Sequence, residues 1–413
     1  MNKIEITSPA GSWESLMAAI KAGADSIYFG VDSLNMRHLG AKNFKISDLN
    51  KITKICKQNN IKSYLTLNSL IYDNDIKKAK NMINHAKKAE VNAIIAFDIS
   101  VMEHCKKIKM PCCASTQCNI TNTEAVKFYA NYCDIVVLAR ELNLKQISLI
   151  CNYIKNNKIK GPSGKLVKVE LFIHGALCIS ISGKCGMSLH NYNRSANRGE
   201  CLQTCRRAFK VTDLESNQEL KIDNQYIMSP SDLCTLPNID EIISSGVSIL
   251  KIEGRARPPE YVYNVTKAYK TAVTLIKNNT FTQEKKENLL LELKKVFNRG
   301  FWQGGYYLGK KTDEWSEVRN SKATERKKFI GSVTKYYPKS SVAILNVRNS
   351  IKKDSEVYII GKQTGIIRIF LKEIYKNGKP VNEEVKGEDI SIKTSEKVKK
   401  GDEIYLIEKT NIL

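Results

Sequence analysis

Residues 170–207 of this chain read ELFIHGALCISISGKCGMSLHNYNRSANRGECLQTCRR and hold four of its twelve cysteines, two of its five histidines and four arginines. The stretch begins with Val169, Leu171 and Ile173 at alternating positions, as in a buried strand, and continues as a segment rich in Gly, Ser, Asn and Cys. A chain of 413 residues can form a hydrophobic core without such a segment. The composition of this stretch therefore indicates a chemical rather than a purely structural role.

The sequence on both sides of this stretch alternates short apolar runs with amphipathic helical patterns. One helix, for example, carries Trp13, Leu16, Met17 and Ile20 on one face. Eight β/α units in about 250 residues favour a (β/α)8 barrel of the TIM type, with a doubly wound open sheet as the alternative. The eight runs expected to form strands are 4–6, 26–29, 62–67, 93–96, 113–116, 135–138, 167–173 and 248–252.

The pattern changes after the barrel. We expect residues 1–275 to form the catalytic barrel and 276–325 to form a helical connector with a charged helix at 283–297. Residues 326–413 carry short alternating runs and turn signals such as Asn377-Gly378, which favour a small antiparallel β-barrel. The strands expected in it are 331–336, 341–347, 356–360, 365–371 and 403–407.

Polar side chains follow most of the eight expected barrel strands. In a (β/α)8 barrel the carboxyl ends of the strands carry the active site. Each group could instead serve a turn or a helix cap. The expected ring consists of 8–11, Tyr28 and Gly30, Asn68, Asp98, 115–117, Arg140 and Glu141, His174 and Gly175, and 253–255.

The composition limits the partners and the compartment. Sixty-six Lys and Arg against 42 Asp and Glu give a net charge of +24, which favours contact with RNA or DNA, although a Lys-rich composition alone also produces such an excess. The first 30 residues lack the order of a secretory signal, and no apolar run approaches the length of a membrane span. We therefore expect a soluble cytoplasmic protein with no membrane partner.

The cysteines favour metal chemistry, because a reducing compartment disfavours a disulfide framework. Six residues lie between Cys178 and Cys185, fifteen between Cys185 and Cys201, and 32 between Cys201 and Cys234. Four thiolates suit an iron–sulfur cluster or a tetrahedral zinc ion, and the spacing differs from the C-x2-C pairs of zinc ribbons. Cys205 is followed by no cysteine at C-x-x-C distance, so the radical-SAM pattern is absent.

The chain contains several longer motifs: ELFIHGALC at 170–178, SGKC at 182–185, RGEC at 198–201, CRR at 205–207, KIEGR at 251–255, SPAG at 8–11, STQ at 115–117 and LARE at 138–141. These motifs resemble those of the peptidase U32 family, and the resemblance extends over nearly the whole chain. The length is similar to that of the family's tRNA hydroxylation protein P branch, which helps to make 5-hydroxyuridine at the tRNA wobble position.

The resemblance implies a cofactor, a co-substrate and a partner. Relatives in ubiquinone hydroxylation hold a [4Fe-4S] cluster on four cysteines, and the matching positions are Cys178, Cys185, Cys201 and Cys234, with Cys205 not expected as a ligand. The tRNA branch hydroxylates uridine C5 without O2 and depends on prephenate as co-substrate. The implied partners are prephenate, the tRNA anticodon loop and a possible paralogous U32 protein.

Further roles follow from the charges of the residues. Arg140, Arg255 or Arg257 can bind a dicarboxylate through paired hydrogen bonds. Glu253 and His174 are candidates for proton transfer at the barrel mouth, with Arg255 as the third catalytic candidate, and a satisfied core histidine is the alternative for His174. The arginines of the opening stretch suit RNA phosphates, with Tyr192 for stacking, or they offset the charge of a cluster. These arginines are Arg194, Arg198, Arg206 and Arg207.

Two other functions remain open. A collagenase-like peptidase is suggested by the family's name, yet the chain has neither His-Glu-x-x-His nor Gly-x-Ser-x-Gly, and clustered cysteines suit a metal better than one activated thiol. The second is an RNA-binding accessory protein whose cluster only holds a loop in place. We expect the tRNA-hydroxylating enzyme.

Overall fold

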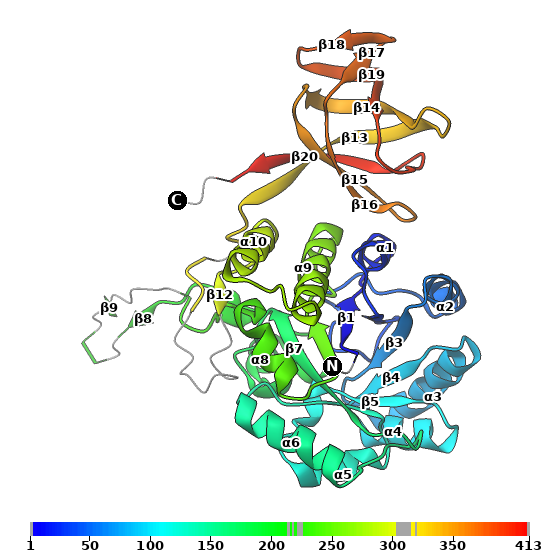
Figure 1. Ribbon diagram of the computed structural model, residues 1–413. Coiled ribbons are helices and arrows are strands. Elements are labelled where there is room, and N and C mark those ends of the chain that lie inside the picture. Colours follow the sequence, from blue (N-terminus) through cyan, green and yellow to red (C-terminus); the bar gives the residue numbers. More distant parts are fainter. Residues whose placement is uncertain are drawn as a thin grey trace.

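The computed structural model describes residues 3–212, 215–216, 219–220, 226–302, 315–318 and 320–410. Figure 1 shows a larger part made of strands and helices and a smaller part made of strands, joined near α10 (Gln283–Lys294). The smaller part lies beside α1 (Trp13–Lys21) and α9 (Pro259–Lys277).

The larger part is the expected closed barrel of eight parallel strands. Each strand pairs with the next along the chain, and the last pairs with both the first and the seventh, which closes the sheet. All eight expected strands are confirmed within a few residues. They are β1 (Glu5–Pro9), β2 (Ser26–Phe29), β3 (Lys62–Leu67), β4 (Ala93–Ala96), β5 (Cys112–Ala114), β6 (Ile135–Val137), β7 (Lys168–Gly175) and β11 (Ile249–Ile252).

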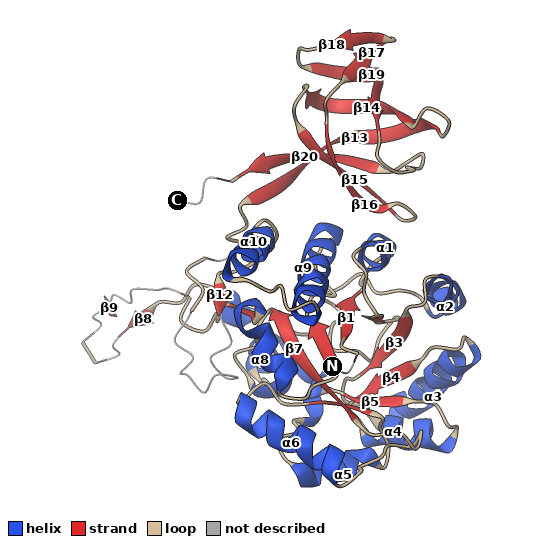
Figure 2. Cartoon of the chain, in the orientation of Figure 1, coloured by secondary structure: helices blue, strands red, loops and turns tan. Residues whose placement is uncertain are grey.

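The helices surround this barrel (Figure 2). Several start where a side chain accepts a hydrogen bond from a free backbone N–H of the first turn, as Ser12 Oγ does from Ser15 N at 3.2 Å. Besides α1, α9 and α10, the helices are α2 (Leu49–Gln58), α3 (Asp73–Lys88), α4 (Ile99–Lys107), α5 (Thr123–Ala130), α6 (Leu144–Asn156), α7 (Met187–Tyr192) and α8 (Ile239–Ser244).

Two short strands extend the sheet at β7 and were not expected. β10 (Asp232–Cys234) pairs antiparallel with the end of β7, and β12 (Phe301–Trp302) pairs parallel with β10. Neither strand belongs to the alternation of apolar runs and amphipathic helices, so only their pairing defines them. They place residues far along the chain beside the end of β7.

The interior of the barrel contains polar pairs as well as aliphatic side chains. Lys251 Nζ donates to Glu170 Oε1 between β11 and β7, and both side chains are buried. Tyr64 donates its hydroxyl to Glu5 Oε1 at 2.8 Å. Buried charges are tolerated when they are paired in this way.

The smaller part is an antiparallel sheet of eight strands with its own hydrophobic core. Five strands match the expected runs, whereas β17, β18 and β19 were missed because charged residues interrupt their alternation. Asn377 and Gly378, both with positive φ, form the turn between β17 and β18. The strands are β13 (Glu325–Tyr337), β14 (Val342–Ile351), β15 (Glu356–Gly361), β16 (Gly365–Phe370), β17 (Ile374–Lys376), β18 (Lys379–Val381), β19 (Val385–Lys393) and β20 (Glu403–Lys409).

Apolar contacts join the two parts. Tyr358, Ile360 and Ile366 are buried in the same cluster as the barrel core. A Cβ added at Gly365 would lie 2.9 Å from Met17 Cβ, so β16 packs directly on α1. The expected boundaries after residues 275 and 325 remain predictions.

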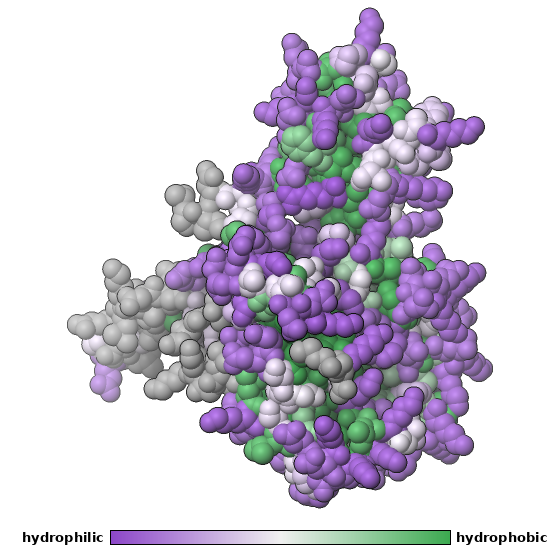
Figure 3. Space-filling model, in the orientation of Figure 1, coloured by the Kyte–Doolittle hydropathy of each residue, from purple (hydrophilic) through white to green (hydrophobic). Residues whose placement is uncertain are grey.

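The surface seen in Figure 3 is covered mainly by hydrophilic side chains on both parts. This is consistent with the large excess of Lys and Arg in the sequence. Among the described residues, no helix has both the length and the apolar character that crossing a membrane requires.

Candidate active site at the carboxyl ends of the barrel strands

A cavity of about 390 Å³ opens at the carboxyl ends of the barrel strands. Residues in or after β2, β3, β5, β6 and β11 form one side of it, and the 176–206 part of the loop after β7 forms the other. The Cys-rich loop therefore covers the mouth of the barrel. The expected strand-end residues that line the cavity are Tyr28, Asn68, Ser115, Thr116, Gln117, Arg140, Glu141, Glu253 and Arg255.

Other members of the expected ring have structural positions. Ser8 Oγ is bonded to Thr266 Oγ1 of α9 at 2.7 Å. Asp98 caps α4 by accepting from Ser100 N at 2.9 Å. Gly175, with φ of +107°, lets the ends of β7 and β11 approach, since a Cβ there would lie 2.7 Å from the Glu253 carbonyl oxygen.

Four thiols line the cavity: Cys178, Cys185, Cys201 and Cys205. The sulfurs of Cys185 and Cys201 each accept a backbone N–H two residues further on, from Met187 and Gln203, at 3.4 Å. Burial raises the pKa of Cys205, and the positive charge of Arg206 opposes this effect. The three other thiols raise the pKa of Cys205 further. The four thiols thus surround one space, although within the described residues no three His, Cys, Asp or Glu side chains are arranged as a metal site.

Cys234, expected as the fourth ligand, is not brought to this cavity. It lies on β10 opposite His174 of β7 and is fully buried. Its sulfur is 3.9 Å from the Tyr269 hydroxyl of α9. Cys205, and not Cys234, therefore lines the same cavity as the other three thiols, because the loop after β7 returns to the mouth while the Cys234 side chain contacts Tyr269 of α9.

His174 does not line the cavity either. Its ring packs against Tyr261, Tyr269 and Phe301, and its Nδ1 is 3.3 Å from the Tyr269 hydroxyl. Burial lowers the pKa of His174 to about 3, and Arg257 adds to this. These surroundings match the alternative role, a satisfied core histidine. The ring is neutral near pH 7 and lies outside the cavity, so it cannot transfer a proton to or from a substrate there.

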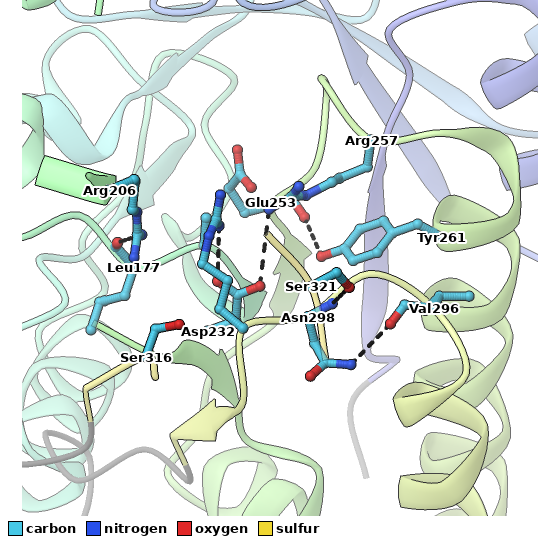
Figure 4. Close-up of polar contacts among 12 residues, drawn as sticks. Leu177, Arg206, Asp232, Glu253, Arg257, Tyr261, Val296, Asn298, Ser316 and Ser321 are labelled. Carbon is cyan, nitrogen blue, oxygen red and sulfur yellow. Dashed lines mark hydrogen bonds and ion pairs between the residues drawn. The ribbon is translucent and has the colours of Figure 1, made fainter. Parts of the chain in front are cut away.

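Glu253 lies at the centre of a cluster of arginines. Its Oε1 is 2.9 Å from Arg37 Nη2, and its backbone carbonyl accepts from the Tyr261 hydroxyl at 2.9 Å (Figure 4). Burial raises the pKa of Glu253, but Arg37, Arg257 and Arg140 outweigh it, so the net pKa is lowered. Glu253 is ionised at neutral pH, which suits a positioning role better than proton transfer.

Arg255 is buried in the cavity wall with 4% of its surface exposed. Its Nη1 donates to Thr66 Oγ1 at 2.8 Å. Burial lowers the pKa of Arg255 to about 10, so the guanidinium still carries its charge at neutral pH. A buried cation at the end of β11 favours an anionic partner.

The family profile described as peptidase family U32 matches residues 11–317, about three quarters of the chain. The chain belongs to peptidase family U32. The match includes the barrel strands from β2 onward and the Cys-rich loop.

Relatives of this U32 chain carry two kinds of name. A protein named collagenase from Porphyromonas gingivalis is 47% identical over 410 residues, with 99% of both chains covered. tRNA hydroxylation protein P1 of Bacillus subtilis is 29% identical, with 87% of this chain and 84% of the relative covered. The 23S rRNA 5-hydroxycytidine C2501 synthase of Escherichia coli is 32% identical, with 67% of this chain and 40% of the relative covered.

The loop arginines of the U32 chain divide into two groups. Arg206 donates to Ser229 Oγ, to the Pro230 carbonyl and to the Leu177 carbonyl, so it ties the loop together (Figure 4). Arg198 is paired with Asp75 and stacks 4.0 Å from the centre of the Tyr72 ring.

The other two arginines lie at the surface. Arg207 donates to the Tyr192 hydroxyl at 2.5 Å. Arg194 is 3.6 Å from Glu200 and more than half exposed. Arg194 and Arg207 are more exposed than Arg198 and Arg206.

Some residues of the U32 site were not singled out from the sequence. Arg37 reaches Glu253 from the loop after β2, where no periodic pattern marks it. Lys251 lies in a strand and reads as a surface residue, yet its side chain enters the cavity. Thr116, by contrast, belongs to the expected ring; its buried hydroxyl lines the cavity and has no hydrogen-bond partner among the described residues. The length of the 31–43 loop on the active face of a barrel was the one available signal for Arg37.

Proposed function

We propose that this protein modifies RNA by hydroxylating a pyrimidine at C5, with the wobble uridine of a tRNA anticodon loop as the target. A [4Fe-4S] cluster and prephenate are the proposed cofactor and co-substrate. The observation that carries the proposal is a cavity in which four thiols face a group of arginines at the barrel mouth. Relatives named for tRNA hydroxylation and for rRNA 5-hydroxycytidine synthesis support the reaction class.

The thiols fit the proposed cluster in number and chemistry. Cubane clusters are held by four Cys thiolates and tuned by hydrogen bonds to sulfur. Cys178, Cys185, Cys201 and Cys205 line one space, and two of them already accept backbone N–H groups. When bound, the cluster would supply one-electron transfer next to the cavity. We therefore assign Cys205 as the fourth ligand in preference to Cys234.

The chain's own residues would bind and orient the reactants. Glu253 fixes the Arg37 guanidinium, and Arg140 and Arg255 present positive charge to the cavity. The loop after β7 covers the barrel mouth, which limits the access of water to the reacting atoms.

The rim of the cavity suits single-stranded RNA. Arg194 and Arg207 are exposed charges, and the exposed Tyr192 ring lies beside Arg207. Splayed bases of RNA loops stack on aromatic and guanidinium planes, while phosphates pair with arginine. Apolar side chains are exposed in the same loop, at Ile181 and Leu202. A paralogous U32 chain is an alternative partner for them.

Peptidase activity is the second candidate, because the relative named collagenase is 47% identical over 410 residues. Against it, no cysteine of the described residues is hydrogen-bonded to a histidine, and the cavity contains no histidine among its lining residues. Cysteine proteases depend on a base beside the thiol. An RNA-binding accessory protein with a structural cluster is the third possibility.

The experiment combines two measurements. Protein purified without oxygen is analysed for iron, sulfide and zinc, and we expect about four irons and four sulfides per chain. Nucleosides from total tRNA and rRNA of a deletion strain are then analysed by mass spectrometry, with the wild type and a Cys185→Ala chain as complements.

Loss of 5-hydroxypyrimidines that only the wild-type chain restores supports the proposal. A colourless protein with one zinc, or unchanged nucleosides in a strain lacking every paralogue, would contradict it. Cleavage of gelatin by the pure protein, abolished by Cys178→Ala, would favour the peptidase. If RNA binding and modification survive oxidation of the cluster, the cluster is structural.

A further inference from the structure

We infer that the barrel mouth contains a two-point site for a small dicarboxylate, with Arg255 binding one carboxylate and Arg140 the other. The inference rests on the proposed function, whose co-substrate it provides with a binding site. It is carried by the positions and partners of the cations that line the cavity.

Most of these cations already have partners. Arg37 is paired with Glu253 at 2.9 Å and Lys251 with Glu170 in the barrel interior. Arg257 lies 4.0 Å from Asp232. Arg206 is occupied by one hydroxyl and two carbonyl acceptors. These four cations are therefore held by the protein itself.

Arg255 is different. Its guanidinium is buried, yet the Thr66 hydroxyl is its single hydrogen-bond acceptor among the residues that the structure describes. No carboxylate in the same residues lies within ion-pair distance of it. A guanidinium has five N–H donors, and a buried one that lacks acceptors is costly. Because the side chain lines the cavity, an anion there would supply the missing acceptors.

Arg140 has a comparable position on the other side of β7. Its Nη1 donates to the Ala176 carbonyl at 3.0 Å, and its guanidinium stacks 4.2 Å from the centre of the Phe172 ring. Stacking fixes the plane of the Arg140 guanidinium and leaves its other edge free for a carboxylate. Within the described chain, Arg140 forms no ion pair.

The spacing suits a ligand with two carboxylates. Arg140 follows β6 and Arg255 follows β11, and both strands pair with β7. The guanidinium of Arg255 extends to Thr66 of β3, whereas that of Arg140 stacks on Phe172 of β7, so the two charges approach the cavity from different sides. A cavity of about 390 Å³ lies in the range of small-molecule sites. The unpaired Thr116 hydroxyl in its wall offers a further contact.

An RNA phosphate is the competing source of negative charge. The low exposure of Arg255 disfavours it, because a polynucleotide backbone would have to enter the cavity to reach the guanidinium. Arg194 and Arg207 at the rim are better placed for phosphates.

The test measures equilibrium binding to the full-length protein purified without oxygen. The ligands are prephenate and glutarate, each with two carboxylates, and phenylpyruvate and butyrate, each with one. The variants are Arg255→Gln, Arg255→Lys and Arg140→Gln, with Arg348→Gln on the exposed face of β14 as the matched control. Circular dichroism and thermal melting verify that each variant is folded.

We expect at least one dicarboxylate to bind ~10- to 100-fold more tightly than its monocarboxylate counterpart, the size of one charge-assisted pair. The difference should fall below about 3-fold in Arg255→Gln and Arg140→Gln, stay intermediate in Arg255→Lys and be unchanged in Arg348→Gln.

The inference is overturned if neither dicarboxylate is preferred, or if the preference survives in the glutamine variants. It is also overturned if a tRNA anticodon stem-loop competes with the dicarboxylate and loses its own affinity in Arg255→Gln. If glutarate binds as expected while prephenate does not, the site stands and the co-substrate of the proposed function fails. If the dicarboxylate binds as expected while the RNA nucleosides of the deletion strain are unchanged, the binding site likewise stands and the proposed function fails.

Discussion

At the scale of single residues, the position of a side chain relative to β7 decides its role. The chain places Cys205 at the cavity and Cys234 beside the end of β7, although both are cysteines within or near the same stretch of sequence. His174 and Glu253 are likewise both at strand ends, yet only Glu253 faces the cavity. Side chains that alternate across a sheet separate such neighbours.

We predict that Cys205→Ala loses the iron–sulfur cluster while Cys234→Ala retains it. The reason is that Cys205 shares the cavity with the other three thiols, whereas Cys234 packs against Tyr269. Iron and sulfide content of protein purified without oxygen provides the measurement, with Cys151→Ala on α6 as the control. An unchanged iron content in Cys205→Ala, together with loss of iron in Cys234→Ala, would contradict this prediction and support the ligand set expected from the sequence.

His174 predicts a dependence of stability on pH. Its pKa is about 3 in the folded chain, lowered by burial, and near 6.5 when unfolded. A lowered pKa means that its stabilising contribution is complete above pH 6.5 and declines as the pH falls toward 3. Between pH 6.5 and 5.0 the loss is about 2 kcal/mol.

Urea unfolding of His174→Asn and wild type at pH 7.5 and 5.0 tests this. We expect the asparagine variant to be less stable than the wild type at pH 7.5, because the smaller side chain leaves a cavity and an altered hydrogen bond to Tyr269. Between pH 7.5 and 5.0 its free energy of unfolding should fall by about 2 kcal/mol less than that of the wild type. Parallel declines in both proteins would mean that His174 titrates normally in the folded state.

At the scale of elements, the loop after β7 is held by contacts at its ends and in its middle. Arg206 donates hydrogen bonds to the Leu177 carbonyl at the start of the loop and to Ser229 and Pro230 beyond its end. Arg198 bonds the Leu70 carbonyl and pairs with Asp75, which fastens the middle of the loop to α3. A segment with little regular structure thus has a defined position over the barrel.

We predict that Arg206→Gln loosens this loop while Arg207→Gln does not. Removing a charged donor from buried carbonyl acceptors costs about 2 kcal/mol, so local opening becomes about 30-fold more frequent. Hydrogen exchange of peptides from 177–206 detects it. Equal exchange in the two variants would show that other contacts hold the loop.

At the scale of the whole molecule, the terminal sheet is part of the packed structure. Tyr358, Ile360 and Ile366 are buried against α1 and α9, and Lys21 of α1 pairs with Glu396 at 2.6 Å. A shared apolar interface predicts that the two parts support each other's stability.

We predict that Ile366→Ala destabilises the barrel by about 2–4 kcal/mol, because it opens a cavity between β16 and the helices. Phe370→Ala in the same strand is the control, since Phe370 is 49% exposed and its loss costs far less. The barrel's unfolding midpoint, followed by tryptophan fluorescence in urea, measures both. An unshifted midpoint in Ile366→Ala would mean that the two parts unfold independently.

The barrel could be predicted from the sequence because its eight strands are long enough to show apolar runs between amphipathic helices. The antiparallel character of the terminal part followed from its turns, but β17, β18 and β19 did not, since charged residues obscure their alternation. Of the residues expected at the site, six line one cavity at the barrel mouth, and their roles stay predictions; they are Cys178, Cys185, Cys201, Arg140, Glu253 and Arg255. Arg37 and Lys251 were missed because neither a loop position nor a strand register reveals where a side chain points.

The sequence by itself determined the order of strands and helices, the excess of positive charge and the chemical character of the stretch at residues 170–207. Local patterns of apolar residues, turns and spacings carry that information. The tertiary structure decided which thiols meet, which histidine is buried and which arginines remain without carboxylates. Those outcomes depend on the closure of the barrel, which brings together residues more than 200 positions apart such as Arg37 and Glu253, and on the pairing of β10 with the end of β7.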